Sequence, residues 1–159
     1  MNRTRILIAI GAVLVLGAVN FSILGKERIK RDGVVVFLDL QPVDPRSLMQ
    51  GDYMTLRFRL AQDIRSTVNP LPAEGATAVA PVNLARNQVG SLARAGETGN
   101  VRMRYRIRKG EVWLGTNAFF FEEGREEQYA RARYGEFRVD PTSGEAVLVG
   151  LRDAGLKPL

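Results

Sequence analysis

The stretch PVDPRSLMQGDYMTLRFRL, from Pro42 to Leu60, contains a polar turn that leads directly into an alternating segment. Asp44-Pro45 ends any strand entering from Asp39, and Gly51 is predicted to take a positive φ where the turn closes. Apolar and polar side chains then alternate from Tyr53 onward, which is the period of a half-buried β-strand. We expect four apolar side chains of this strand to face the core: Met54, Leu56, Phe58 and Leu60.

Short motifs in this stretch resemble one bacterial family, the GDYXXXLXY proteins, which are membrane-anchored and have no assigned activity. The motifs are Asp44-Pro45-Arg46, Gly51-Asp52-Tyr53, Leu56 and Phe58. That pattern, read literally, asks for the leucine and the aromatic residue one position later, where this chain has Arg57 and Arg59. Further similar motifs occur at residues 113–115, 119–124, 132–135 and 148–151. The resemblance implies membrane attachment and a shared fold, and it supplies no catalytic residue.

An apolar run from Ile6 to Leu24 is interrupted only by Asn20 and Ser22. About 20 apolar residues span a bilayer as a helix, whereas a cleaved signal peptide carries a shorter apolar region and a small-residue cleavage site. The sequence therefore predicts an uncleaved signal-anchor transmembrane helix over residues 1–25. A basic juxtamembrane linker is expected over 26–33 and a single β-rich domain over 34–159.

The membrane orientation rests on two opposed signals. Basic residues flank both ends of the apolar run, and their balance slightly favours a cytoplasmic C-terminal side. A short basic N-terminus before a single apolar run is typical of an export signal, however, and long domains translocate largely regardless of charge. With the family resemblance, this predicts a single-pass protein of the cytoplasmic membrane whose C-terminal domain is periplasmic or extracellular.

The rest of the chain is predicted to be dominated by strands. Val34–Leu40 has the composition of a buried strand, and weaker strand candidates cover residues 76–84 and 88–94. Two hairpins are expected, one joining 101–107 to 111–121 through Lys109-Gly110, the other joining 136–139 to 145–151.

The helices of the domain are expected to be few. Residues 61–66 could form a short helical turn, and Glu122–Ala132 is the only clear helix, with Tyr129 and Ala130 facing the sheet. At least two rings of Phe119-Phe120-Phe121 should enter the core. The predicted class is α+β and β-dominated: an antiparallel sheet or a small, partly open barrel with one packed helix, preceded by a single N-terminal transmembrane helix.

The chain contains no cysteine and no histidine. Disulfides, thiolate metal sites and Cys-His or Ser-His nucleophile pairs are thereby excluded. The acidic residues also lack the spacing of a calcium loop. We accordingly expect no metal and no cofactor.

The most distinctive charged feature is the arginine row, which alternates with apolar residues along 101–108: Arg102, Arg104, Arg106 and Arg108. Residues two apart on a strand repeat about every 7 Å, a spacing that suits a run of phosphates or acidic headgroups. The row is either a contact surface for anionic lipid or an envelope polymer, or a solvated face paired to Glu111 and other carboxylates. The net charge of +6 could suggest nucleic acid, but no recognition motif is present, so no nucleic-acid partner is expected.

The function predicted from these observations is a non-enzymatic accessory or binding module of a bacterial envelope protein assembly, beside other membrane proteins. The alternative is a membrane-bound Ser/Lys peptidase-like enzyme with Ser47 as nucleophile and Lys109 as base. Lys109 adjoins Gly110 at a predicted hairpin tip, where water favours the protonated amine. Asp52 and Tyr53 are interpreted as braces of the strand entry, because an aspartate after a turn glycine commonly accepts backbone N–H bonds.

Overall fold

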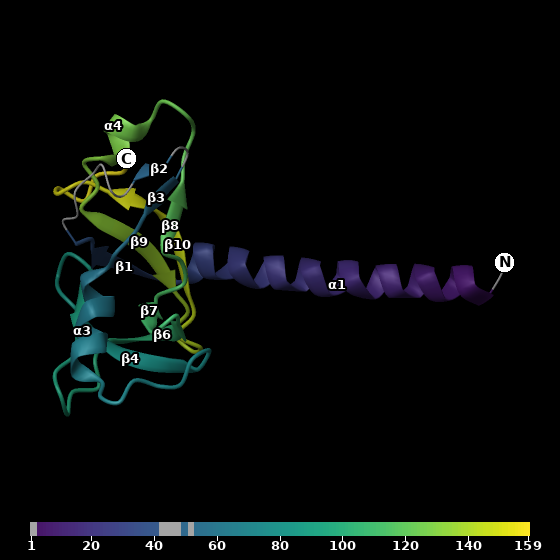
Figure 1. Ribbon diagram of the computed structural model, residues 1–159, viewed down its shortest axis with the longest axis horizontal. Coiled ribbons are helices and arrows are strands. Elements are labelled where there is room, and N and C mark those ends of the chain that lie inside the picture. Colours follow the sequence, from purple (N-terminus) through teal and green to yellow (C-terminus); the bar gives the residue numbers. More distant parts are fainter. Residues whose placement is uncertain (1–2, 42–48, 51–52) are drawn as a thin grey trace.

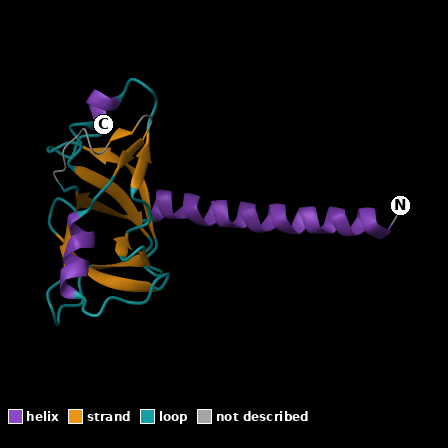
Figure 2. Cartoon of the chain, viewed as in Figure 1, coloured by secondary structure: helices purple, strands orange, loops and turns teal. Residues whose placement is uncertain are grey.

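The computed structural model describes residues 3–41, 49–50 and 53–159, a long N-terminal helix attached to a β-rich domain (Figure 1; Figure 2). The helices are α1 (Arg3–Asp32), α3 (Arg59–Thr67) and α4 (Glu126–Tyr129). The strands are β1 (Val34–Asp39), β2 (Met49–Gln50), β3 (Tyr53–Thr55), β4 (Thr77–Leu84), β5 (Val89–Leu92), β6 (Val101–Arg108), β7 (Glu111–Trp113), β8 (Ala118–Phe120), β9 (Tyr134–Val139) and β10 (Ala146–Arg152).

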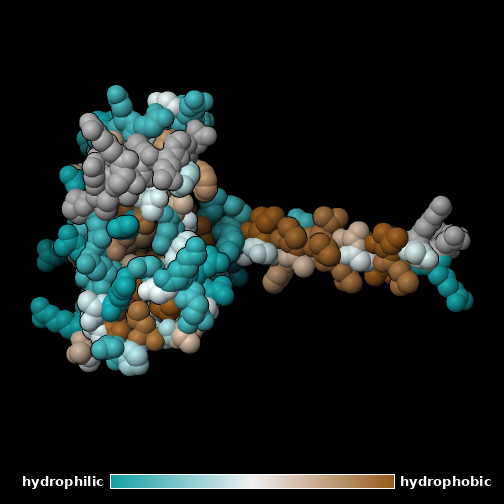
Figure 3. Space-filling model, in the orientation of Figure 1, coloured by the Kyte–Doolittle hydropathy of each residue, from teal (hydrophilic) through white to brown (hydrophobic). Residues whose placement is uncertain are grey.

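Helix α1 extends away from the domain and exposes its apolar side chains along most of its length (Figure 3). By length and composition, Leu7–Asp32 is a helix that could cross a membrane. The apolar part from Ile6 to Leu24 is about 28 Å long at 1.5 Å per residue, close to the thickness of a bilayer core of about 30 Å. The predicted anchor segment is thus helical and lies outside the packed core.

The junction between α1 and the domain is short and packed. The helix continues through residues 26–32, the segment expected as a linker, and only Gly33 separates it from β1. The Gly33 N–H donates to the Ile29 carbonyl at 2.9 Å, and a Cβ at position 33 would lie 2.5 Å from that oxygen. Ile29 is buried, Lys26 forms an ion pair with Glu145, and α1 contacts β9 and β10. The last turns of α1 therefore belong to the packed domain.

A curled sheet of seven strands forms most of the domain, in the order β10-β9-β1-β5-β4-β6-β7. Every pair in it is antiparallel except β1 and β5, which run parallel. Val34–Asp39 is a central strand because its valines, Phe37 and Leu38 suit a position with neighbours on both sides. The β-dominated α+β class and the partly open barrel are confirmed, with one parallel pair added.

The two ends of this sheet approach each other at the β9–β10 hairpin. Strand β7 pairs with β6 only from Arg106 to Arg108. Further along β6, the turn of the β9–β10 hairpin replaces β7 as its neighbour, and the Arg104 N–H donates to the Gly144 carbonyl at 2.7 Å. A Cβ at Gly144 would lie 2.9 Å from the Arg102 carbonyl, and a Cβ at Gly115 would lie 2.8 Å from the Ala146 carbonyl. Glycines at these positions allow the sheet to curl into a half-barrel.

The alternating stretch after the Asp44 turn behaves differently from its prediction. Its apolar side chains, Met54, Leu56, Phe58 and Leu60, are all buried as expected. The strand, however, ends at Thr55, and the chain enters α3 at Arg59 after a bridge between Leu40 and Phe58. Leu60 and Ile64 lie four residues apart on the buried side of this helix, a spacing that overrides the alternation.

The predicted return strand over residues 111–121 is confirmed only over β7, which pairs antiparallel with β6. The chain leaves β7 at Trp113 and bends through Gly115, whose φ is +85°. Strand β8 pairs with β3 instead, in a second sheet ordered β2-β3-β8. The rings of Phe119 and Phe121 pack against Tyr129, while Phe120 is 74% exposed. Two of the three phenylalanine rings thus contribute to the core, as expected.

The helix predicted over Glu122–Ala132 is confirmed only over a single turn. Gly124 has φ +84° and interrupts the segment, so α4 is a single turn over Glu126–Tyr129. Tyr129 is buried as expected, whereas Ala130 is exposed. The longer helix of the domain is α3, which exceeds the short helical turn expected over residues 61–66.

Candidate functional site

The family-like motif positions fall into two groups. Asp44, Pro45, Arg46, Gly51 and Asp52 lie outside the described residues, as does the positive φ expected at Gly51. Among the described positions, the Tyr53 ring lies 5.7 Å from the Phe120 ring, and the Leu56 N–H donates to the Asn117 backbone carbonyl at 2.7 Å. Phe58 is buried with its ring 5.2 Å from that of Phe137. These three side chains pack in or beside the core.

The arginine row lies on the outer face of β6, opposite the buried face that holds Val101, Met103, Tyr105 and Ile107. Arg102 and Arg104 donate to carbonyl oxygens of the β9–β10 turn, those of Thr142 at 3.4 Å and Ser143 at 3.3 Å. Arg106 donates to the Gly75 carbonyl at 3.1 Å. The Arg108 guanidinium lies 5.1 Å from the centre of the Trp113 ring.

The row has no paired carboxylate within the described part of the chain. The predicted pairing with Glu111 is wrong, because Glu111 forms its ion pair with Arg65 of α3. Glu74 lies near Arg106 and Arg108, but backbone N–H bonds from Lys109 and then Gly110 are the main causes that lower its pKa. The Glu74 carboxylate is thus held by the β6–β7 turn.

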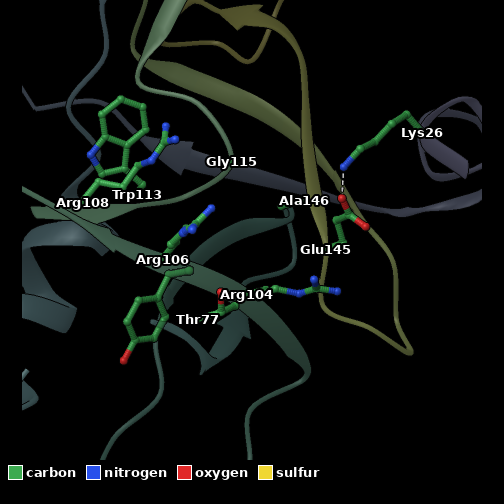
Figure 4. A pocket seen from close by; sticks show the side chains of 10 residues that line it. Lys26, Thr77, Arg104, Arg106, Arg108, Trp113, Gly115, Glu145 and Ala146 are labelled. Carbon is green, nitrogen blue, oxygen red and sulfur yellow. Dashed lines mark ion pairs between the residues drawn. The ribbon is translucent and has the colours of Figure 1, made fainter. Parts of the chain in front are cut away.

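A pocket of about 340 Å³ opens between this row and the end of α1 (Figure 4). Its charged lining is Lys26, Arg104, Arg106, Arg108 and Glu145, four cations and one anion. Figure 4 shows Lys26 reaching Glu145 from α1, while Arg104 and Arg106 project from the β6 side of the pocket. Because the lysine and the glutamate neutralise each other, three arginines dominate the electrostatic field of the pocket.

Lys26 was expected from the sequence only as part of the basic juxtamembrane linker, and Trp113 was not singled out as a site residue. Lys26 is the first charged residue after the apolar run, so its depth at a membrane surface was readable from the sequence. Trp113 lies directly across the ladder from Arg106, and side chains in such a pair share one face. The sequence does not show which residue of β7 faces Arg106, so this contact could not be predicted from it.

A second hollow, of about 600 Å³, lies between α3 and β7, and Arg108 and Trp113 line both spaces. Lys109, the base of the alternative enzyme prediction, is exposed at the β6–β7 tip, and its backbone N–H donates to Glu74 at 2.7 Å. Ser47 lies outside the described residues, so the Ser/Lys pair stays a prediction. Within residues 3–41, 49–50 and 53–159, no cluster of acidic side chains could hold a metal ion.

One buried carboxylate was also missed. Glu136, on the outer face of β9, is 6% exposed and binds two arginines. Arg152 donates to it from Nε at 2.7 Å and also from Nη2, and Arg138 Nη2 lies 3.7 Å away. Gly150 stands opposite Glu136 on β10, and Arg152 lies two residues further along that strand.

A family model described as GDYXXLXY protein matches residues 15–151. The chain belongs to the GDYXXLXY family. The spacing in that description is one residue shorter than the spacing taken from the sequence alone, and it places the leucine on Leu56 and the final aromatic residue on Phe58. The family's tyrosine is thus a phenylalanine here, and its ring is in the core. Neither curated proteins nor solved structures match the chain.

Proposed function

We propose that this GDYXXLXY protein is a non-enzymatic accessory module held against the outer surface of the cytoplasmic membrane, where it binds neighbouring membrane proteins. The observation that carries the proposal is the packed junction between α1 and the domain, formed by Ile29, Gly33 and the Lys26–Glu145 ion pair. A domain on a flexible linker samples many positions above the membrane, whereas a packed junction holds the domain at one height above the membrane and in one orientation. Fixed placement suits a subunit that contacts partners in the same membrane.

The accessory role predicts a stable assembly. Native membranes dissolved in a mild detergent should release the full chain as part of a particle larger than the chain in its own micelle. Size-exclusion chromatography with immunodetection measures this. A chain that elutes alone under conditions that preserve other membrane complexes would contradict the role.

The proposed orientation can be tested by cysteine labelling, since the chain has no cysteine of its own. Ser66→Cys is a suitable site because α3 lies on the side of the domain away from α1 (Figure 1). A membrane-impermeant maleimide should label it in intact spheroplasts. The matched control, Thr4→Cys at the other end of α1, should be labelled only after the membrane is opened. The reverse pattern would place the domain in the cytoplasm.

A further inference from the structure

We propose that the pocket between the end of α1 and β6 binds the phosphate of an anionic phospholipid headgroup. The proposal rests on membrane attachment by α1, and it is independent of which side the domain occupies and of any protein partner. Four features support it: charge, donor geometry, depth in the membrane and the apolar side chains beside the arginines.

The charge of the pocket is unbalanced within the described residues. Lys26 and Glu145 satisfy each other, while Arg104, Arg106 and Arg108 have no carboxylate partner there. Each guanidinium carries five N–H donors, and the bonds made by Arg104 and Arg106 go to only two carbonyl oxygens, those of Ser143 and Gly75. Donors therefore remain for a phosphate, whose oxygens match the arginine fork.

The depth of the pocket matches that of lipid phosphates. Lys26 follows Leu24, the last residue of the apolar run, by two positions, a rise of about 3 Å along the helix axis. The polar layer beyond the hydrocarbon is about 5–8 Å thick on each side of a bilayer. A pocket walled by Lys26 thus opens within the headgroup layer, where the anchored chain meets lipid at high local concentration.

The apolar neighbours of the row favour a bilayer surface over a soluble anion. Val79 stands opposite Arg104 and is 49% exposed, and Trp113 stands opposite Arg106. Basic side chains mixed with tryptophan and aliphatic residues are typical of surfaces that lie in the membrane interface. A polymer in free solution would cover the arginines and leave these apolar groups in water.

Trp113 is the only tryptophan of the chain and lies in the pocket, so its fluorescence reports binding directly. The full chain in a non-ionic detergent is titrated with phosphatidylglycerol, and in parallel with phosphatidylcholine, inorganic phosphate and soluble polyphosphate. We expect a saturable change with phosphatidylglycerol that weakens with salt, because exposed charges are screened. Phosphatidylcholine and inorganic phosphate should give little response.

The double variant Arg104→Gln/Arg106→Gln should weaken phosphatidylglycerol binding by about tenfold or more, since each basic residue near an anionic surface adds to the attraction. Arg86→Gln/Arg94→Gln is the matched control, because it removes the same charge from two exposed positions outside the pocket. Arg106→Gln alone leaves the Arg104 bond to Ser143 intact and should still weaken binding severalfold if the double variant unfolds.

Several outcomes would overturn the proposal. Equal responses to phosphatidylglycerol and phosphatidylcholine would exclude selection of an anionic headgroup. Saturation by inorganic phosphate would indicate a site for a soluble anion, and stronger binding of polyphosphate would indicate a polymer site. Equal affinity of the native chain, Arg106→Gln and the double variant would exclude the pocket.

Discussion

Two groups of strand arginines lie on the outer face of the same curled sheet, and among the described residues only one group pairs with a carboxylate. On β9 and β10, Arg138 and Arg152 bind Glu136, which is nearly buried. On β6, Arg104 and Arg106 stand opposite Val79, Thr77 and Trp113 and donate to carbonyl oxygens alone. A carboxylate within reach on the same sheet face, as Glu136 is for Arg138 and Arg152, thus decides whether an arginine braces the sheet or remains available to an external anion.

The largest effect is expected from Arg152→Ala. Glu136 would keep only Arg138 at 3.7 Å, and leaving a buried charge poorly paired should lower the free energy of unfolding by about 3 kcal/mol. Urea unfolding of the full chain in detergent, followed by Trp113 fluorescence, measures the loss. Arg106→Ala is the control and should cost no more than about 1 kcal/mol, because its side chain is exposed. Equal losses in the two variants would refute the distinction between the two groups.

A carboxylate added beside the β6 arginines should make them resemble the paired arginines of β9 and β10. Val79→Glu places an acidic side chain opposite Arg104, and opposite charges across a ladder contribute roughly 0.2–1 kcal/mol. Stability should hold or rise slightly, while phosphatidylglycerol binding should fall about tenfold as the arginines become paired. Val79→Gln, of similar size and no charge, should lose far less binding, because it removes the apolar contact of Val79 and leaves the arginines unpaired. Loss of binding in both variants would point to shape rather than charge.

A smaller effect, dependent on pH, is expected at the turn that meets the row. The pKa of Asp140 is lowered, first by the Ser143 backbone N–H bond, then by the Ser143 side chain and the Thr142 N–H, with Arg28 nearby. Because the folded pKa lies below the unfolded value of about 3.9, the carboxylate stabilises the fold above that pH. The stabilisation disappears as the pH falls through the folded pKa.

Asp140→Asn should therefore be less stable than the native chain at pH 7, by about 1 kcal/mol or less. The difference should shrink as the pH is lowered toward 3. Thermal unfolding of both chains across this range measures it. A difference that stays constant with pH would show that the charge of Asp140 plays no part in the turn.

The sequence predicted those features that depend on neighbours along the chain. The buried strand from Val34, the alternation along β6 and the turn at Lys109-Gly110 all follow from local patterns, and the structure confirms them. The start of α3 was missed because Phe58 and Leu60 fit both a strand and a helix until the bridge to Leu40 bends the chain. Tertiary contacts, not propensity, decide such short apolar segments.

The candidate site was predicted only as far as local patterns along the chain reveal it. The arginine row was visible because its four members share one strand face. Its meeting with Lys26 requires the β9–β10 hairpin to carry Glu145 to α1, more than 100 residues away in the sequence. Glu136 and Arg152 likewise meet only through the register of β9 and β10. Contacts of this kind depend on strand order, which no local pattern contains.

With α1 in a bilayer as proposed, the packed junction at Gly33 would pass a tilt of the helix on to the domain. A transmembrane helix tilts when its apolar length exceeds the hydrocarbon thickness around it. Because α1 continues into the domain up to Asp32 and Ile29 is buried there, a change in the tilt of the helix would reorient the sheet by the same angle. A thinner membrane would rotate the β6 face relative to the headgroups, so lipid thickness itself would set how deeply the arginines reach.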